Sequence, residues 1–398
     1  MPWETISVFE ERVRLVMTYL AGEATMTVLS RRHKVSRKTG YKWVKAYRRR
    51  GLAGLGDASR KPRSGRHWTR SSTRELIVGM RRQHPRWGAA KIIARLRQLR
   101  PRRQWPAPSS AHGLLQRAGL VKRGRRRTRW PMVGSRCPSA ARSNEIWTID
   151  FKGQFRTGDG KYVYPLTVVD VHSRFLLACV ALLSVSYEVA WPAFQKLFQT
   201  YGLPDALHSD NGEPFASTKS IGGLSHLMVK FIRLGIRIER GRPGHPEDNA
   251  KHERMHRTLK DEATKPPGAN RAAQQTKNDF FQQEFNHERP HEALGQRQPG
   301  RIYRSSRRPF PSALPEIEYP TAFTIRRVRS GGEIMWNGRR LFITEVLVGE
   351  RVGIVNDDNV SLMYFGPVLL GYIDQKRWKV LPTKAMKQLD LMEKRKTK

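Results

Sequence analysis

Ile146-Trp-Thr-Ile-Asp150 alternates apolar and polar side chains and ends on a carboxylate. This alternation is typical of a strand, so we expect Asp150 in a strand or at its end. A second carboxylate, Asp210, occurs in Leu207-His-Ser-Asp-Asn-Gly212. A short strand is expected before it, and the Asn-Gly pair after it favours a turn, to whose shape Asn211 would contribute.

A third carboxylate, Glu253, occurs in Gly241-Arg-Pro-Gly-His-Pro-Glu-Asp-Asn-Ala-Lys-His-Glu253. Pro246 and Asp248 are typical of a helix start, and Asp248 is expected to cap the helix rather than to bind a metal. Glu253 then lies one turn inside that helix. The sequence thus predicts three carboxylates on three separate elements.

Three converging carboxylates are suited to holding two divalent ions. Two such ions, about 3.5–4 Å apart, can activate a water or a 3′-hydroxyl and stabilise the leaving oxygen of a phosphodiester. Oxygen ligands suit Mg²⁺ or Mn²⁺, so these are the cofactors we expect, two ions per site. A lone acidic residue is usually only solvated, and the flanking motifs must therefore carry the prediction.

In this order, Trp-Thr-Ile-Asp150, His-Ser-Asp210-Asn-Gly and Pro-Glu-Asp-Asn-Ala-Lys-His-Glu253 resemble the catalytic core of the DDE transposases. The resemblance is to the IS3 and IS481 types of bacterial insertion sequences, which are related to retroviral integrases, and it is strong over residues 144–300. It implies an RNase H-like α/β fold with a mixed sheet. It also implies that Asp150 binds both ions and that Asp210 and Glu253 each complete the coordination of one ion.

The spacing of the acidic residues leaves more than one candidate for the third metal-binding carboxylate. Between Asp210 and Glu253 lie 42 residues, more than is usual in the IS3-type core, and an insertion around Ser217–His226 would explain the excess. Three other glutamates are nearby: Glu247, the main competitor, precedes the expected helix and the Asp-Asn pair, and Glu239 and Glu262 lie outside the matching motif. We therefore favour Glu253.

The net charge of the chain is strongly positive. Its 398 residues contain 75 Lys and Arg against 34 Asp and Glu, a net charge of +41, and residues 1–143 hold 36 basic and 6 acidic side chains. A field of this sign attracts polyanions, so double-stranded DNA is the expected partner. A basic ribosomal type of protein is the alternative.

The sequence has two cysteines, no apolar run of membrane length and no leader pattern. We therefore expect a cytoplasmic, nucleoid-associated bacterial protein.

Two helical segments precede the core. Residues 1–56 predict three helices with helix-turn-helix proportions, the third capped by Ser36 with Tyr41, Val44 and Tyr47 inward. Gly40 is expected to weaken this helix by roughly 1 kcal/mol. Four cations on its outer face would meet DNA: Arg37, Lys38, Lys42 and Lys45. A plain three-helix bundle with a charged face is the alternative.

After a linker at 57–71, residues 72–121 predict a second helix-turn-helix-like domain, whose last helix Ser109 or Ser110 could cap. Residues 122–143 form a basic linker expected to lie along phosphates or to be a disordered tether. Its candidate DNA-binding residues are Arg123, Arg125, Arg126 and Arg127.

The catalytic domain is expected over 144–305. Strands are predicted at 146–155, 162–169, 174–182 and 235–239, and helices at 187–201 and 222–234. Arg257 and Lys260 share a helix face with Glu253 and would hold DNA phosphate, or would form ordinary helix ion pairs with it. Asp170 is interpreted as structural, and Asn286, Arg289 and His291 as closing the fold.

Residues 318–382 predict a small, SH3-like β-barrel of six short strands, at 323–328, 333–336, 339–344, 351–355, 361–364 and 369–373, with a hairpin turn at Asn337-Gly338. Residues 383–398 are a charged tail.

We therefore expect a multidomain DNA transposase that binds terminal inverted repeats, nicks their 3′ ends with metal-assisted water and joins them directly to target DNA. Pairing two ends implies at least a homodimer on DNA. One alternative is a DNA-binding regulator with an inactive core, which would not join strands. Another is an RNase H-like nuclease, which would cut without joining.

Overall fold

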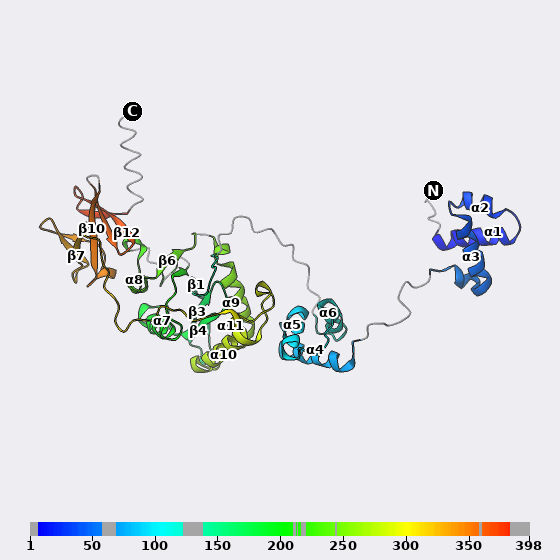
Figure 1. The fold of residues 1–398 in the computed structure, drawn as a ribbon, viewed down its shortest axis with the longest axis horizontal. Helices are drawn as coiled ribbons and strands as arrows, with labels where there is room; N and C mark the ends of the chain where they lie inside the picture. Colours follow the sequence, from blue (N-terminus) through cyan, green and yellow to red (C-terminus); the bar gives the residue numbers. More distant parts are fainter. Residues whose placement is uncertain are drawn as a thin grey trace, which may run out of the picture. The chain divides into compact units, whose positions relative to one another are not determined.

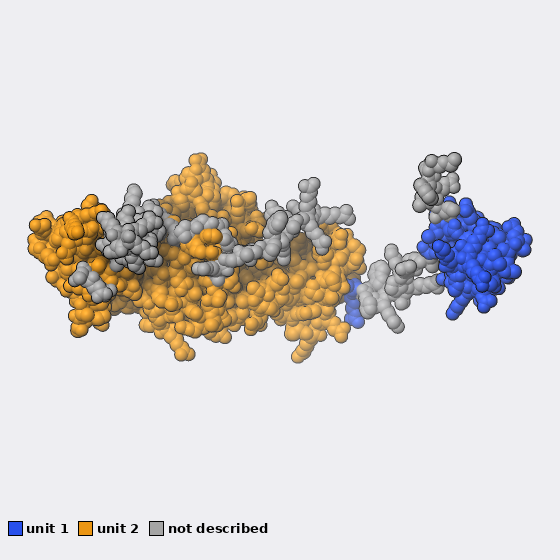
Figure 2. Space-filling view, turned by 90° about the horizontal axis from the view of Figure 1, so that it is seen from above, with its two compact units in different colours: residues 1–70 blue, residues 71–398 orange. Residues whose placement is uncertain are grey.

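In this computed structural model the described residues are 7–57, 69–121, 138–209, 212, 214–215, 220–242, 245–357 and 360–382. The chain divides into two compact units, residues 1–70 and 71–398, which Figure 2 distinguishes by colour. Each unit is described separately below.

The first unit is a three-helix domain made of α1 (Val8–Leu20), α2 (Met26–Arg32) and α3 (Arg37–Arg50). The Ser36 side chain caps α3 by accepting the Thr39 amide, as the sequence predicts. The core of the unit gathers apolar side chains from all three helices and the following turn: Leu15, Val16, Met26, Leu29, Val44 and Leu55.

One prediction for α3, the inward position of Tyr41, is wrong. Tyr41 is 51% exposed and lies edge-on to Tyr19, whereas Val44 enters the core. Gly40 is buried, and a Cβ there would overlap the sulfur of Met26. The glycine therefore permits α2 and α3 to approach closely, which compensates for its low helix propensity.

The second helical segment, α4 (Ser71–Gln83), α5 (Ala89–Leu99) and α6 (Pro108–Arg117), surrounds the buried Trp87. Neither Ser109 nor Ser110 caps α6, because the helix already begins at Pro108 with Ala107 in the capping position. Proline suits the first helical position, since its missing N–H would have no helical partner there.

This segment packs on the central domain through polar contacts. His84 Nδ1 lies 3.0 Å from a Glu284 carboxylate oxygen, and Arg86 donates to Asp261 at 2.8 Å. The Gln298 amide also donates to the Gln98 side chain. The second helical segment therefore belongs to the same compact unit as the central sheet.

The central domain is built on a six-stranded mixed sheet (Figure 1). Its main strand order is β4-β3-β1-β5-β6, with the short β2 paired to β3. β1 runs antiparallel to β3 and parallel to β5, and this is the mixed sheet that the sequence predicts. The strands are β1 (Ile146–Phe151), β2 (Phe155–Arg156), β3 (Tyr162–Asp170), β4 (Leu176–Leu182), β5 (Ala206–Ser209) and β6 (Arg237–Arg240).

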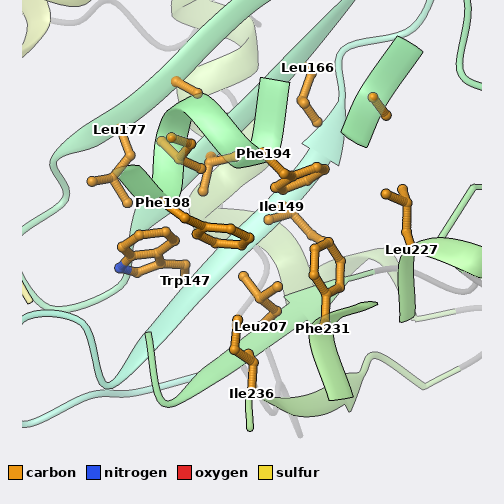
Figure 3. Packing of buried hydrophobic residues seen from close by; sticks show 14 of the residues in the cluster. Trp147, Ile149, Leu166, Leu177, Phe194, Phe198, Leu207, Leu227, Phe231 and Ile236 are labelled. Atoms are coloured by element: carbon orange, nitrogen blue, oxygen red, sulfur yellow. The ribbon is translucent and has the colours of Figure 1, made fainter. Parts of the chain in front are cut away.

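Helices cover both faces of this sheet: α7 (Tyr187–Tyr201), α8 (His226–Arg233), α9 (Ala250–Glu262) and α10 (Arg271–Gln283), followed by a π turn (Glu284–Glu288) and the short α11 (Pro299–Ile302). On one face Trp147 and Ile149 of β1 pack with Phe194 and Phe198 of α7 and Phe231 of α8 (Figure 3). On the other face Val169 of β3 and Cys179 of β4 pack with α9 and α10.

Two elements differ from the expected ranges. The strand predicted over 146–155 ends at Phe151, and after Gly153, whose φ is +83°, the short β2 pairs with β3. The helix predicted over 222–234 begins only at His226, because Gly222 and Gly223 both have positive φ. Glycine permits this backbone conformation and so ends regular structure locally.

The C-terminal region forms a five-stranded antiparallel sheet ordered β13-β12-β11-β10-β7 and a separate hairpin β8-β9. The strands are β7 (Thr324–Arg327), β8 (Glu333–Trp336), β9 (Arg339–Phe342), β10 (Arg351–Asp357), β11 (Val360–Phe365), β12 (Val368–Asp374) and β13 (Lys379–Leu381). The predicted turn at Asn337-Gly338 joins β8 to β9, with positive φ at both residues. Closure of these strands into a barrel is not found among the described pairings and stays a prediction.

This C-terminal sheet shares its apolar core with the central domain. Met228, Val229 and Ile232 of α8 belong to the same buried cluster as Val352 and Phe365 of the sheet. At the edge of the cluster Arg233 pairs with Glu350 at 3.1 Å. The two sheets are thus joined through α8.

Candidate active site

Asp150 lies near the end of β1, on the face of the sheet that α9 covers. Side chains alternate along a strand, so Trp147 and Ile149 enter the apolar core while Thr148 and Asp150 point to the opposite face. Asp150 is paired in register with Thr167 of β3, and its side chain is 19% exposed. The strand therefore presents a largely buried carboxylate at the rim of the domain.

The start of α9 reaches this carboxylate. The Asn249 amide donates to Asp150 Oδ2 at 3.3 Å, and His256 Nδ1 lies 3.7 Å from the same oxygen. The other atom of the amide, Asn249 Oδ1, is buried and has no hydrogen-bond partner among the described residues. A buried acceptor of this kind beside a carboxylate would be satisfied by a cation or by a water bound to one.

A hydrogen-bonded network anchors α9 to the two strands. The Thr167 hydroxyl donates to the Asp150 backbone oxygen at 3.0 Å, and the Nε2 atoms of His252 and His256 lie 2.7 and 2.6 Å from the same hydroxyl. His252 Nδ1 lies 2.8 Å from the Thr148 hydroxyl. Because a hydroxyl has one proton and two lone pairs, both imidazoles are assigned as Nε2–H donors to Thr167.

These tautomers leave the lone pair of His256 Nδ1 beside Asp150 Oδ2. Burial, and after it the charge of Lys152, lowers the pKa of His256 to about 3. Burial and the neighbouring histidines hold the pKa of His252 well below its usual value. Both rings are therefore neutral at pH 7, and Asp150 gains no imidazolium partner.

Cations surround the rim of the site. Burial and the charge of Lys260 lower the pKa of Lys152, while Asp150 raises it. Lys152 follows β1 directly, and Lys260 comes from the exposed side of α9. A positive field beside Asp150 favours the approach of a phosphate backbone.

The three predicted carboxylates are placed as follows. Asp150 is in the site described above. Glu253 lies in the first turn of α9 and is exposed, four residues after Asn249 and three before His256. Because residues three and four apart share a helix face, Glu253 lies on the same face of α9 as Asn249 and His256, both of which contact Asp150. Asp210 and Asn211 lie outside the described residues, directly after β5, which is paired with β1.

The competing acids have other partners. Arg289 donates to both carboxylate oxygens of Glu262 at 2.7 Å, and Glu239 lies 3.7 Å from Arg237. The expected cap at Asp248 is wrong, because Asn249 occupies the capping position of α9 and Arg242 donates to both oxygens of Asp248. The side chain of Glu247 lies outside the described residues.

The residues expected to be structural have clear structural contacts. Asp170 is fully buried and accepts hydrogen bonds from the Asn144 amide and from the amide and hydroxyl of Ser173. Asn286 exchanges two hydrogen bonds with the backbone of Leu176, at the start of β4.

The structure describes some of the candidate DNA-binding side chains and not others. Arg37, Lys38, Lys42 and Lys45 are all exposed on α3, and Arg257 and Lys260 are exposed on α9. The predicted contacts of Arg123, Arg125, Arg126 and Arg127 lie outside the described residues.

Five residues of the site were not singled out from the sequence: Thr148, Lys152, Thr167, His252 and His256. The two histidines are four residues apart on one helix, a spacing that places both rings on one face and could have drawn attention to them. One ligand atom from each of Asp150, His252 and His256 lies within 4.8 Å of the others. Imidazole nitrogen suits transition metals better than Mg²⁺, and three of the four ring nitrogens already contact threonine hydroxyls. We therefore interpret the rings as supporting Asp150.

Comparison with known proteins shows what the central domain and the helical segments are similar to. Residues 140–246 and 234–299 match two models, each described as an integrase core domain. Over these residues the chain is similar to an integrase core domain. Residues 11–63 match a helix-turn-helix domain and residues 39–115 a homeodomain-like domain.

Individual relatives are viral. The Gag-Pol polyprotein of baboon endogenous virus (strain M7) is 32% identical over 124 residues, 31% of this chain and only 7% of the polyprotein. An intasome chain of simian T-cell lymphotropic virus is 15% identical, with a TM-score of 0.37, covering 71% of this chain and 99% of that one. The catalytic core of the HTLV-2 integrase, solved in complex with magnesium, is 15% identical with a TM-score of 0.33 over 41% of this chain and 99% of that one.

Among the described residues, no helix is both long and apolar enough to cross a membrane.

Proposed function

We propose that this protein is a DNA transposase of the insertion-sequence type. It would bind terminal inverted repeats, nick their 3′ ends by hydrolysis and join those ends to target DNA by direct transesterification. The observation that carries the proposal is the meeting of Asp150 with the start of α9, on which Glu253 lies, inside an integrase core domain.

The donor set fits divalent metal. Asp150 and Glu253 offer carboxylate oxygens, and Asn249, whose Oδ1 is a buried acceptor, contacts Asp150. Mg²⁺ or Mn²⁺, as a pair, would supply an activated oxygen nucleophile and stabilise the leaving oxygen. Asp150, Asp210 and Glu253 would hold these ions, with Asp210 brought to the site by β5.

The remaining residues would position the carboxylate and the DNA. The network of Thr148, Thr167, His252 and His256 fixes α9 against β1 and so sets the separation of Asp150 and Glu253. Arg257 and Lys260 would hold backbone phosphate beside the site, since both are exposed on α9. The helix-turn-helix segments would supply recognition of the repeat, through Arg37, Lys38, Lys42 and Lys45 in the first of them.

The test is a cleavage and strand-transfer assay with short duplexes that carry the terminal repeat. We expect Asp150→Asn and Glu253→Gln to lower both reactions about 1000-fold or more, the scale on which a group that stabilises developing charge acts. Binding of the duplex should stay intact. Glu239→Gln is the matched control and should keep activity. Cutting by Asp150→Asn in Mg²⁺ would refute the site.

The same assay distinguishes the two alternatives. A regulator with an inactive core would bind the repeat and give neither product. An RNase H-like nuclease would cut without joining and without need for the repeat sequence. Formation of a joined product by the unchanged chain would exclude both.

Two end duplexes must meet for joining, so we also propose that the chain acts as at least a homodimer on DNA. A cytoplasmic, nucleoid-associated location in a bacterium is part of the same proposal. Light scattering of the chain with and without the end duplex would measure the assembly.

A further inference from the structure

A cavity lies between α9 and the second helical segment. Its volume is about 470 Å³, in the size range of pockets that bind small ligands. Its walls come from the α4–α5 region, β1, β3 and the turn after it, residues 248–258 and residues 285–293. Segments far apart in the sequence therefore meet around one partly open space.

The walls of this cavity are strongly basic. Six cationic side chains line it, against the two carboxylates of Asp248 and Glu292. The cationic residues are Arg86, Lys91, Arg174, Lys251, Arg254 and Arg289. Part of the lining is apolar, including Met255 and Phe285, so the space is neither a plain salt-bridge cluster nor an ordinary hydrophobic core.

Some of these cations are already paired. Arg86 contacts Asp261 at 2.8 Å, and Arg289 contacts Glu262 at 2.7 Å. For Lys91 and Arg254, in contrast, no carboxylate oxygen lies within 4.0 Å in the described part of the chain. Two charges thus remain on the wall without a close counter-ion.

The same positive charges contribute to lowering the pKa values of Lys91 and His291. Burial, followed by the charges of Arg289 and Arg254, lowers the pKa of Lys91 to about 8. Burial, with Lys91 as the next cause, lowers the pKa of His291 to about 3. A bound anion would relieve this repulsion, because opposite charge favours the cationic form of Lys91.

We propose that this cavity binds a phosphate group, with Lys91 and Arg254 as its principal ligands. Arginine and lysine are the side chains that proteins use to bind phosphate, the former through paired N–H donors. The group could belong to a free diphosphate or nucleotide or to the backbone of bound DNA. The cavity adjoins the candidate active site, because Thr148, Asn249 and His252 also line it. Binding of a DNA phosphate there would rest on the proposed function, whereas binding of a free anion would not.

The first arm of the test uses inorganic pyrophosphate without DNA. Calorimetric titration of the full chain at fixed ionic strength should give saturable binding, and Lys91→Gln and Arg254→Gln should each raise the Kd at least about tenfold. Lys196→Gln, which changes an exposed lysine of α7 outside the cavity, is the matched control. This result would assign the site to a free anion.

The second arm uses a terminal-repeat duplex over a range of salt concentrations. If the phosphate belongs to DNA, pyrophosphate shows no saturable binding and Lys91→Gln reduces the salt slope of duplex binding by about 1, as does Arg254→Gln. Lys196→Gln should keep the original slope. Hydrogen exchange in α5 and α9 verifies that each variant is folded, and if Lys91→Gln is not, Arg254→Gln decides. The proposal is overturned if the cavity variants behave like Lys196→Gln with both probes.

Discussion

The two faces of β1 differ in what holds them against their helices. Trp147 and Ile149 enter an apolar layer with α7 and α8, in which Phe194 and Phe198 are fully buried (Figure 3). Thr148 and Asp150 meet α9 through hydrogen bonds to buried histidines and an asparagine. The apolar face gains from removal of surface from water, whereas the polar face depends on every donor finding an acceptor. The apolar face thus tolerates small shifts of its helices, whereas the hydrogen bonds of the polar face fix the position of α9 relative to β1.

The largest effect on stability should come from the apolar face. Phe194 is fully buried, with ring centroids 5.0 Å from Phe231 and 5.9 Å from Phe198. We expect Phe194→Ala to lower the free energy of opening of β1 and β5 by about 3–5 kcal/mol, measured by hydrogen exchange. Phe280→Ala, at a residue 71% exposed, should change it by under about 0.5 kcal/mol. Equal effects in the two variants would contradict this view of the core.

On the side of the sheet that α9 covers, we expect His291 to lower the stability of the protein in acid. The pKa of His291 is about 3, below its usual value, because of burial and the nearby Lys91 and Arg289. The unfolded chain therefore binds more protons between about pH 3 and 6.5. The stability contributed by the neutral ring is complete above about pH 6.5 and is lost as the pH falls, by up to about 1.4 kcal/mol for each pH unit.

His291→Gln removes this titration and should flatten the fall in melting temperature between pH 6.5 and 4.5. His112→Gln, at an exposed position of α6, is the control and should leave the pH profile unchanged. A variant at position 291 whose profile overlays that of the unchanged chain would show that His291 does not contribute to acid unfolding.

The same contrast explains how much could be predicted from the sequence. The alternation in 146–150 is a local pattern, so the strand, its apolar face and the place of Asp150 follow from it. The partners of Asp150 come from α9, about 100 residues later, and no local pattern pairs His256 with Thr167. The predicted start of α8 was wrong because it depends on backbone conformation, with positive φ at Gly222 and Gly223. The role of Gly40 likewise depends on Met26 of another helix.

The smallest of these effects, and the one most specific to the site, should come from Thr167. This hydroxyl is fully buried, donates to Asp150 and contacts both imidazoles. Thr167→Val keeps the volume but leaves two buried ring N–H groups without an acceptor, which should cost about 1–3 kcal/mol in the opening of β1 and β3. Thr167→Ser keeps the hydroxyl and should lose much less.

If the network also positions α9, Thr167→Val should lower DNA cleavage more than it lowers duplex binding, and raising the Mg²⁺ concentration should restore part of the activity. A merely destabilised core would lose both in proportion to the unfolded fraction. Wild-type cleavage and exchange in Thr167→Val would show that these hydrogen bonds are not needed to hold α9, and that the packing of Met255 and Leu259 against β3 and β4 is sufficient.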